Sequence, residues 1–232
     1  MTMKPLVSED TVDALREFDT CTVTNAVERF NIRLRNTGFT DGSIHCRFPD
    51  APAMVGFAVT ARLRSEGPPI TGNMFRDRSD FWNSILAIPA PRVLVLQDMD
   101  DDPGLGAFVG DVHGAILKAL GCVGYVTNGA VRELPGVRSA GLQLFSGSLA
   151  VSHAYAHIFD VGCKVVVGGL EVRPGELLHG DQHGVLAIPT EIAAEIPRVA
   201  EDRRRIEQQV IDFCKSGSFS VERLSEITRA VR

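Results

Sequence analysis

The chain has 232 residues, of which 44% are hydrophobic and 23% charged, a balance that supports a sizeable core and excludes disorder as the main state. Its 24 basic and 29 acidic residues give a formal net charge of −5, so no overall positive charge exists to attract nucleic acid or an anionic membrane. The longest apolar runs are far shorter than a membrane span. We therefore expect a globular protein that binds neither nucleic acid nor a membrane.

Cysteine usage and the first residues bear on location. The five cysteines are scattered and form no Cys-x-x-Cys pair, which argues against a disulfide framework or a cysteine zinc site. Residues 1–5 carry Lys4 and no long apolar stretch, so no secretory signal is expected. Together these features predict a reducing, cytoplasmic location.

The first part of the chain is expected to alternate helices with strands. We expect two helices within residues 9–31, the second beginning at Thr22 or Thr24, a strand over 54–63, a helix over 81–88 and a buried strand over 92–99. A polar, turn-rich loop over 36–52 separates the helical pair from the first strand.

The rest of the chain continues this alternation. The expected elements are a glycine-rich turn over 104–110, a helix over 111–120, a strand over 124–127, a turn at Asn128-Gly129, one helical turn over 130–134 ended by Pro135, strands near 141–145, 164–167 and 184–188, and helices over 191–213 and 221–231. Alternating strands and helices predict an α/β fold with a small mixed or mostly parallel sheet. We assign residues 1–190 to this domain and residues 191–232 to a C-terminal helical extension of it.

One group of residues stands out chemically. Asp111 follows Gly110 at the expected start of a helix, and Arg132 and Glu133 follow after twenty further residues and a returning strand. A helix and a returning strand bring the chain back near its start, so the two acids can lie at the edge of one pocket. A helix N-terminus and an arginine favour an anion, whereas two acids repel one. A divalent cation between the acids removes this conflict. Surface ion pairs and a helix-capping aspartate remain the alternative.

Four segments resemble a known family. GAFVGDVHGAILKALGCVGYVTNGAVREL, residues 106–134, resembles the D-x20-R-D signature of the class II pyruvate aldolases, which share a fold with regulator of ribonuclease activity A. These are the 4-hydroxy-4-methyl-2-oxoglutarate and 4-carboxy-4-hydroxy-2-oxoadipate aldolases. The other segments are DTCTVTNAVERF, MVGFAVTARL and VRPGELLHGDQHGVLAIP, in that order within residues 15–190. The resemblance implies a barrel-like mixed sheet of the swivelling-domain type, flanked by helices.

The resemblance also implies roles for individual residues. Arg132 would bind the carboxylate of the pyruvate unit, Glu133 would be a direct ligand of Mg²⁺ or Mn²⁺, and Asp111 would hold the metal's waters and assist proton transfer. The backbone amides of Val112 and His113, next to Gly110, would hold the substrate oxygens. Catalysis would be a metal-dependent retro-aldol cleavage.

The family further implies a homotrimer or homohexamer with sites between subunits. A neighbouring subunit would add an acid, and Glu191 is the candidate for it. The sequence departs from the family at two positions: Glu133 replaces an aspartate and is one methylene longer, and Gly136 replaces an acid that usually follows three residues later. These departures keep open a second hypothesis, a non-catalytic binding protein similar to the ribonuclease regulator.

Chelation of a 2-oxo acid by a metal polarises the keto group and stabilises the pyruvate enolate that forms when a C–C bond breaks. The expected partner is therefore a small 2-oxo acid, and decarboxylation of oxaloacetate is expected as a side activity because it passes through the same enolate. A lysine Schiff base is the competing mechanism, and Lys164 is the one weak candidate for it.

Three other motifs resemble ligand sites but also have plain structural explanations. The glycines of residues 104–110 imitate a dinucleotide loop, but their spacing is wrong and Asp111 would repel a pyrophosphate. His153 and His157 have zinc-like helical spacing, with a polar helix face as the plainer reading. His179 and His183 are assigned to a turn in which Asp181 makes hydrogen bonds.

Two charged clusters and two cysteines complete the candidates. Four aspartates at the end of the strand over 92–99 are expected in a solvated loop, with a metal contact as the alternative; these are Asp98, Asp100, Asp101 and Asp102. The arginines at 203–205 are expected on a solvated helix face. Cys122 and Cys163 are interpreted as small buried apolar residues.

Overall fold

A computed structural model of the protein describes residues 7–69 and 78–230. The expectations for residues 1–5 and for the last residue of the helix over 221–231 lie outside these residues. Nine strands pair into one mixed sheet in the order β1-β6-β5-β3-β2-β10-β11, with β4 on β5 and β7 on β2. The strands of this sheet are β1 (His45–Cys46), β2 (Met54–Arg64), β3 (Arg92–Asp98), β4 (Ala107–Val109), β5 (Cys122–Val131), β6 (Gln143–Leu149), β7 (His157–Val161), β10 (Leu177–Asp181) and β11 (Gly184–Ile188).

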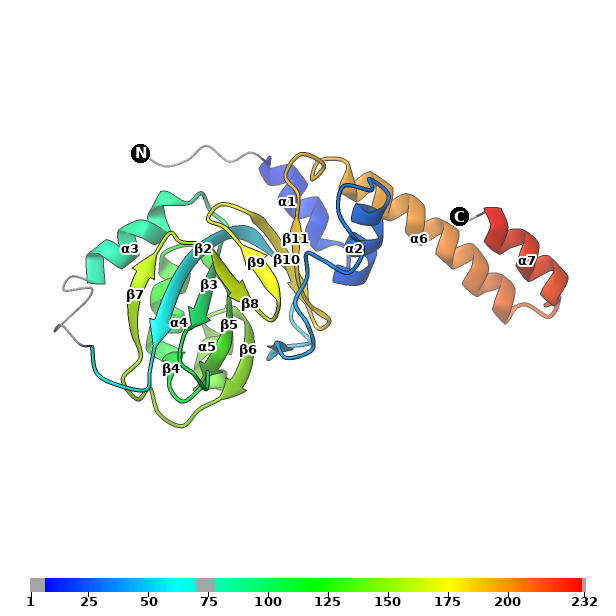
Figure 1. Cartoon of the computed structure of the whole chain (residues 1–232). Helices are drawn as coiled ribbons and strands as arrows, with labels where there is room; N and C mark the ends of the chain where they lie inside the picture. Colours follow the sequence, from blue (N-terminus) through cyan, green and yellow to red (C-terminus); the bar gives the residue numbers. More distant parts are fainter. Residues whose placement is uncertain (1–6, 70–77, 231–232) are drawn as a thin grey trace.

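The sheet curls into a nearly closed, barrel-like body (Figure 1). Its central strands β2, β3, β5 and β6 run parallel, and β7, β10 and β11 join antiparallel. A small hairpin of β8 (Val165–Val167) and β9 (Leu170–Val172) packs on one face of the sheet, over β2, β3 and β5. The expected mixed, barrel-like α/β fold is confirmed.

The central strand β2 shows why the sheet has this form. Side chains alternate between the two faces of a strand. Phe57 and Val59 enter the core beneath the helices, while Met54 and Ala58 enter the core beneath the β8–β9 hairpin. Because both faces are covered, β2 reads as a continuous apolar run, as parallel central strands do.

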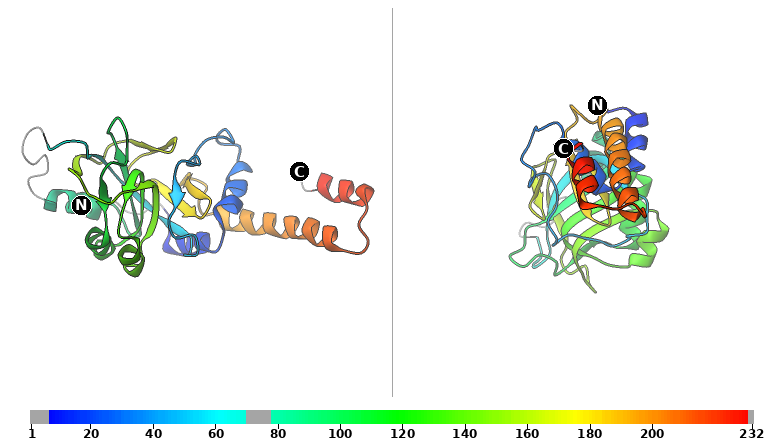
Figure 2. Two further views of the ribbon diagram at one scale, coloured as in Figure 1. Left: turned by 90° about the horizontal axis from the view of Figure 1, so that it is seen from below. Right: turned by 90° about the vertical axis from the view of Figure 1, so that its right-hand side faces the viewer.

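The helices lie in two groups (Figure 1). One group, at the end of the sheet that carries β10 and β11, contains α1 (Glu9–Arg16), α2 (Thr20–Glu28) and the start of α6 (Ile196–Lys215). The other group contains α3 (Arg78–Ala87), α4 (Asp111–Ala119) and α5 (Leu134–Ser139). The far half of α6 and the short α7 (Val221–Ala230) extend away from the body (Figure 2). Within residues 7–69 and 78–230, we find no helix with the length and apolarity that crossing a membrane requires.

Helices α2, α3 and α6 begin elsewhere than expected, and α3 begins at Arg78 and not at residue 81. Helix α2 starts at Thr20, before the expected Thr22 or Thr24, because the Asp19 carboxylate caps it by accepting a hydrogen bond from the Thr22 amide at 2.8 Å. Helix α6 starts at Ile196 and not at residue 191, with a proline in its first turn.

The expected strand over 124–127 is confirmed as part of β5, but the interpretation of residues 128–134 is wrong. Strand β5 continues through Asn128 and Gly129 to Val131 without a turn. The Asn128 side-chain amide pairs with β3, accepting from the Asp98 amide at 2.8 Å and donating to the Asp98 carbonyl at 2.9 Å. Pro135 does not end a helix but lies in the first turn of α5, where its missing N–H costs no hydrogen bond.

The aspartates after β3 are only partly a solvated loop. Asp101 and Asp102 are exposed, but Asp98 and Asp100 are buried. Asp98 accepts from the Gly104 amide at 2.9 Å, and burial raises the pKa of its carboxyl group. Asp100 accepts hydrogen bonds from Ser65, both amide and hydroxyl. These contacts hold the connection that leads into β4, and neither buried acid lines the cavity described below.

A buried polar cluster joins β10 to the α1–α2 connection. His179 lies within β10, not in a turn, and is fully buried. Its Nε2 lies 3.1 Å from the carbonyl oxygens of Leu15 and Phe18, so this nitrogen carries the proton, and Nδ1 accepts from the Thr20 hydroxyl at 3.0 Å. Asp181 makes the expected hydrogen bond to the His183 amide, at 2.9 Å. The His179 imidazole is therefore neutral in this cluster.

This cluster predicts that acid destabilises the fold. Burial lowers the pKa of His179 below its ordinary value of 6.5, so below that pH the unfolded chain binds a proton that the folded chain does not. The free energy of unfolding should then fall by up to about 1.4 kcal/mol per pH unit below this value. Denaturant titrations between pH 7.5 and 5.0 measure it, and His179→Gln, which keeps a donor and an acceptor, should show a shallower dependence. Equal slopes for both proteins would contradict the assignment.

Candidate functional site

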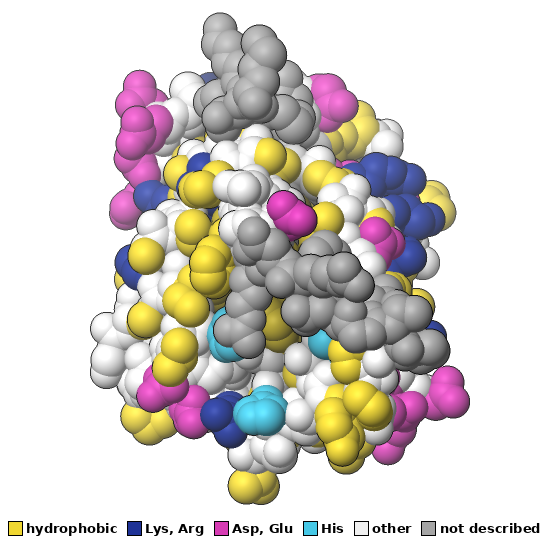
Figure 3. Space-filling view, turned by 90° about the vertical axis from the view of Figure 1, so that its left-hand side faces the viewer, with side chains coloured by type: hydrophobic (Ala, Val, Ile, Leu, Met, Phe, Trp, Pro, Cys, Tyr) yellow, Lys and Arg dark blue, Asp and Glu magenta, His cyan; other side chains and the backbone are white. Residues whose placement is uncertain are grey.

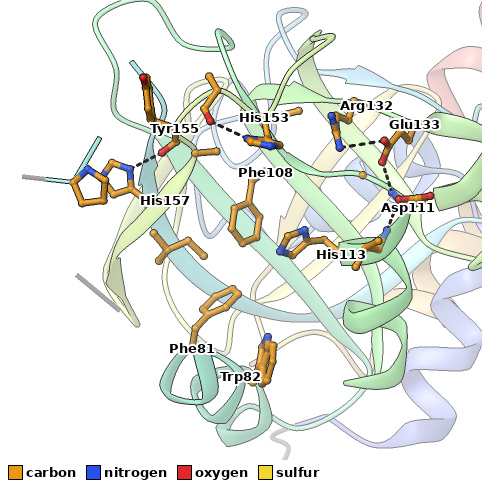
Figure 4. A pocket seen from close by; sticks show the side chains of 17 residues that line it. Phe81, Trp82, Phe108, Asp111, His113, Arg132, Glu133, His153, Tyr155 and His157 are labelled. Carbon is orange, nitrogen blue, oxygen red and sulfur yellow. Dashed lines mark hydrogen bonds and ion pairs between the residues drawn. The ribbon is translucent and has the colours of Figure 1, made fainter. Parts of the chain in front are cut away.

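Asp111, Arg132 and Glu133 line one cavity of about 530 Å³ (Figure 4). Asp111 is the first residue of α4, which follows β4, and Arg132 and Glu133 connect β5 to α5. Strands β4 and β5 are parallel neighbours, with Val109 opposite Val131. The residues that follow these two strands therefore emerge side by side, which confirms that the chain brings the three side chains together.

The three side chains are linked by direct contacts. Arg132 Nη2 lies 3.1 Å from Glu133 Oε1 in an ion pair, and the other oxygen, Oε2, accepts a hydrogen bond from the Asp111 amide at 3.0 Å. Asp111 Oδ1 accepts from the Val112 amide at 2.7 Å. The Arg132 and Glu133 side chains are 30% and 40% exposed, so both can reach a ligand in the cavity.

Backbone geometry fits these contacts closely. Glu133 has a φ of +52°, in the left-handed region that costs a non-glycine residue free energy and is found often at functional sites. A Cβ at Gly110 would lie 2.2 Å from Glu133 Oε2, so glycine there leaves room for the carboxylate. A Cβ at Gly136 would lie 2.5 Å from the Asp111 Cβ. Glycine is therefore favoured at both positions for a steric reason, because a Cβ at Gly110 would overlap Glu133 and a Cβ at Gly136 would overlap Asp111.

The donor set fits a hard cation with few protein ligands. No group of three or more His, Cys, Asp or Glu residues is arranged to hold a metal in the described part of the chain. Zinc sites usually need three or four such ligands, whereas Mg²⁺ commonly takes one or two carboxylates and completes its shell with water and substrate oxygens. Asp111 and Glu133 supply two carboxylates at one end of the cavity and so fit Mg²⁺ or Mn²⁺ better than zinc.

Aromatic side chains form another part of the cavity wall. The Phe108 ring lies 4.7 Å from the His113 ring and 6.0 Å from the Phe81 ring, centroid to centroid, and Trp82 lies beside them. Figure 4 shows Phe81 and Trp82 at the opposite end from Arg132. Sequence reasoning missed these residues because α3 and β4 are far apart in the chain and no motif links them.

His153 and His157 also line the cavity, but not as a helical zinc pair. His153 lies in a loop and His157 is the first residue of β7, an unexpected strand. Their Nδ1 atoms lie 2.8 and 2.7 Å from the carbonyl oxygens of Ala154 and Tyr155. The face of the molecule that carries α3 and β7 shows histidine and hydrophobic side chains close together (Figure 3).

Comparison with known proteins identifies the family to which this fold belongs. The family model RraA-like, described as Aldolase/RraA, matches residues 20–187. The chain belongs to the RraA-like family.

Individual relatives agree with this membership. A Halalkalibacterium halodurans protein, provisionally named a 4-hydroxy-4-methyl-2-oxoglutarate aldolase, is 31% identical over 84 residues, which is 36% of this chain and 40% of the relative. An uncharacterised Pseudomonas syringae protein has a similar structure, with a TM-score of 0.73 and 22% identity over 99% of this chain and 97% of that one. Streptomyces coelicolor RraAS2, described as an unusual member of the RNase ES inhibitor RraA family, has a TM-score of 0.67. Its sequence is 22% identical, and the match covers 89% of this chain and 97% of that one. At these identities the structures support the fold alone.

Apart from part of residues 104–110, the remaining candidates lie outside the cavity. Glu191 follows β11 and does not line the cavity, so its role as a neighbouring subunit's acid stays a prediction. Lys164 pairs with Glu171 at 2.9 Å beside the β8–β9 hairpin. Residues 104–110 include strand β4 and so form no dinucleotide loop.

Arg203 pairs with Glu207, and the arginines at 204 and 205 pair with Glu201 on the expected polar helix face. Cys122 is buried as expected, whereas Cys163 is only half-buried.

The contact between Gly136 and Asp111 gives a direct test. Alanine favours a helix over glycine by about 1 kcal/mol, yet Gly136→Ala should destabilise the protein by about 1–3 kcal/mol because its Cβ overlaps Asp111. Denaturant unfolding measures this change. Gly42→Ala is the matched control, since a Cβ there meets nothing within 4 Å. A Gly136→Ala protein more stable than the wild type would show that Asp111 is free to move aside.

Proposed function

We propose that this RraA-like protein is a divalent-metal-dependent lyase that cleaves a C–C bond of a 4-hydroxy-2-oxo acid and releases pyruvate, with decarboxylation of oxaloacetate as a side activity. The observation that carries the proposal is the meeting of Arg132, Asp111 and Glu133 at the N-terminus of α4 in one cavity. A relative provisionally named as an aldolase supports the same class of reaction.

In this proposal Arg132 binds the carboxylate of the pyruvate unit. A guanidinium binds a carboxylate with two parallel hydrogen bonds, which fixes position and orientation together. Arg132 now pairs with Glu133 and approaches the Val151 carbonyl oxygen at 3.4 Å. An incoming carboxylate replaces Glu133 as the partner of Arg132, and Glu133 becomes available to a cation.

Glu133 and Asp111 are the residues that would hold Mg²⁺ or Mn²⁺. When bound, the ion supplies positive charge where negative charge develops on the keto oxygen during bond cleavage. The extra methylene of Glu133, compared with the aspartate of the resembled aldolases, lets its carboxylate reach the Asp111 amide at 3.0 Å. Glu133 therefore joins the two turns that carry the acids.

The start of α4 contributes to anion binding. Amides in the first turn of a helix carry partial positive charge. We assign the Val112 and His113 amides, beside Gly110, to the substrate oxygens. The Val112 amide is held by Asp111 Oδ1 at 2.7 Å, so Asp111 must rotate when substrate binds. This rotation frees the Asp111 carboxylate to hold water and assist proton transfer.

The proposed assembly is a homotrimer or homohexamer in which a neighbouring subunit completes the cavity, as the resembled family implies. A non-catalytic regulator is the second candidate. Its support is that the Glu133 carboxylate already serves a structural role, as an ion-pair partner of Arg132 and as a hydrogen-bond acceptor for α4. The structural likeness to RraAS2 is compatible with either candidate.

The metal role of Glu133 is tested by Glu133→Gln. Glutamine keeps an oxygen that can accept from the Asp111 amide but loses the charge that a cation needs. We expect Mg²⁺-dependent pyruvate release from oxaloacetate and from 4-hydroxy-4-methyl-2-oxoglutarate, lost with a chelator and reduced about a hundredfold, or about 2.7 kcal/mol, in the variant.

The control is Glu171→Gln, whose side chain pairs with Lys164 and Arg173 away from the cavity. Calorimetric Mg²⁺ binding adds a readout that does not depend on turnover. No pyruvate release by any of the proteins would favour the regulator, and a fully active Glu133→Gln would reject the ligand role.

Arg132→Ala tests substrate orientation. Because the carboxylate contact both binds the substrate and aligns the bond that breaks, KM should rise and kcat should fall together, with kcat/KM lower by at least a hundredfold. Arg138→Ala is the matched control, since Arg138 lies on α5 and pairs loosely with Asp50 at 3.8 Å. Steady-state kinetics of pyruvate release measure both constants. An unchanged KM would reject this role for Arg132.

A further inference from the structure

The loop that follows β6 runs along the end of the cavity that carries Arg132. The Val151 carbonyl oxygen lies 3.4 Å from Arg132 Nη1. The next carbonyl group, that of Ser152, accepts a hydrogen bond at 3.0 Å from the amide of Ala107, the first residue of β4. His153 follows in this loop and lines the same cavity. These contacts keep the part of the loop that carries His153 close to the polar end.

A second set of contacts orients the His153 ring. Its Nδ1 lies 2.8 Å from the Ala154 carbonyl oxygen, and the His153 carbonyl accepts from the Ala156 amide at 2.9 Å. A carbonyl oxygen only accepts hydrogen bonds, so the neutral ring carries its proton on Nδ1 and its Nε2 is an acceptor. Ala154 has a φ of +44°, a left-handed conformation that costs a non-glycine residue free energy and is found often at functional sites. The loop therefore presents Nε2 as the ring nitrogen that can take a proton.

Two other imidazoles among the described residues line the cavity, but they lie elsewhere along it. The His113 ring packs on Phe108, with 4.7 Å between the ring centroids. Figure 4 draws His153 beside Arg132 and draws His157 on the far side of Phe108. His153 is therefore the imidazole that belongs to the polar end.

We infer that His153 is the general base that removes the proton of the substrate's 4-hydroxyl group. This inference rests on the proposed function and adds a catalytic residue to it. Cleavage of the C3–C4 bond turns the 4-hydroxyl group into a carbonyl group, so the hydroxyl proton needs an acceptor. Asp111 and Glu133 are assigned to the cation, and Asp111 acts through the water that it holds. The His153 imidazole takes the hydroxyl proton directly.

The length of the substrate agrees with this assignment. In a 2-oxo acid whose carboxylate is bound by Arg132, C4 is only three bonds away from the carboxylate carbon. Its hydroxyl group therefore stays at the polar end, where the loop with His153 contacts Arg132 through the Val151 carbonyl.

The proton and the electron pairs balance. The 4-hydroxyl proton moves to His153 Nε2, the C3–C4 bond breaks, and its electron pair stays on C3 in the enolate of pyruvate. The oxygen on C4 forms the new carbonyl group. C3 then takes the proton from the His153 imidazolium, which gives the methyl group of pyruvate and restores the neutral ring. With 4-hydroxy-4-methyl-2-oxoglutarate the products are two molecules of pyruvate, without an oxidant or a reductant.

Decarboxylation of oxaloacetate separates this role from the other roles in the site. Oxaloacetate loses carbon dioxide from a carboxylate that is already deprotonated at neutral pH, and no hydroxyl proton is removed. Both reactions pass through the same enolate and depend on Arg132 alike. A base for the hydroxyl group therefore matters to the aldol cleavage and not to the decarboxylation.

His153→Gln tests this role with the two substrates side by side. We expect kcat/KM for pyruvate release from 4-hydroxy-4-methyl-2-oxoglutarate to fall by at least about a hundredfold, or about 2.7 kcal/mol, as loss of a general base does. Pyruvate release from oxaloacetate should stay within about threefold of the wild type. Calorimetric binding of pyruvate in the presence of Mg²⁺ should also stay within about threefold, since pyruvate has no hydroxyl group.

His45→Gln is the matched control, because His45 is exposed on β1 and does not line the cavity. Both activities should be unchanged in this variant. Added imidazole gives a further readout with His153→Ala, which leaves space for a small base. It should raise the aldol cleavage of that variant by about tenfold or more and leave the His45→Gln control unaffected.

Equal losses on both substrates would show that His153 only maintains the site, and an undiminished aldol cleavage would show that another group is the base. Either result overturns the inference and leaves the lyase proposal standing. Loss of the aldol cleavage in His157→Gln and not in His153→Gln would assign the base to the far side of the cavity and also overturn it. No pyruvate release by the wild type from either substrate would reject the lyase proposal, and the inference with it.

Discussion

The parallel pairing of β4 with β5 is the constraint on which the site depends. Strand β4 is short, yet it aligns Val109 with Val131, so that the next residues on each chain segment leave the sheet at the same point. One segment turns into α4 at Asp111 and the other passes through Arg132 and Glu133 into α5. The Glu133 carboxylate then bridges the two segments by accepting from the Asp111 amide. The buried acids Asp98 and Asp100 accept hydrogen bonds from the Gly104 and Ser65 amides, and these bonds fix the connection that leads into β4.

Glu133 makes two contacts in the site, an ion pair and a hydrogen bond, and it also has a left-handed backbone. A residue with this conformation stores free energy that surrounding contacts must offset. The ion pair with Arg132 and the hydrogen bond to α4 are such contacts. In the proposed function a cation and a substrate carboxylate would compete for these same groups, so ligand binding and the local conformation of the β5–α5 connection would be coupled.

The cavity combines a polar end fixed by secondary structure with an aromatic end fixed by packing. The polar end comes from the termini of β4, β5 and α4, whose positions follow from backbone hydrogen bonds. The aromatic end comes from α3 and from Phe108, which face each other only because both pack on the same core. The polar end therefore depends on the pairing of strands, whereas the aromatic end depends on the packing of side chains.

The sequence by itself determined the family, the α/β class and most elements, and it predicted that three polar candidate residues lie close together. It could do so because Asp111, Arg132 and Glu133 lie in one continuous segment whose strand–helix–strand order fixes their proximity. It misplaced the turn at Asn128-Gly129, where a side-chain amide bonded to the Asp98 backbone lets a strand continue through residues that usually form turns. It also assigned His179 to a turn. The local sequence pattern does not show that the Leu15 and Phe18 carbonyl oxygens accept a hydrogen bond from His179 Nε2. Tertiary structure alone decided the aromatic end of the cavity and the placement of His153 and His157, since these side chains come from separate segments and meet only through packing in three dimensions.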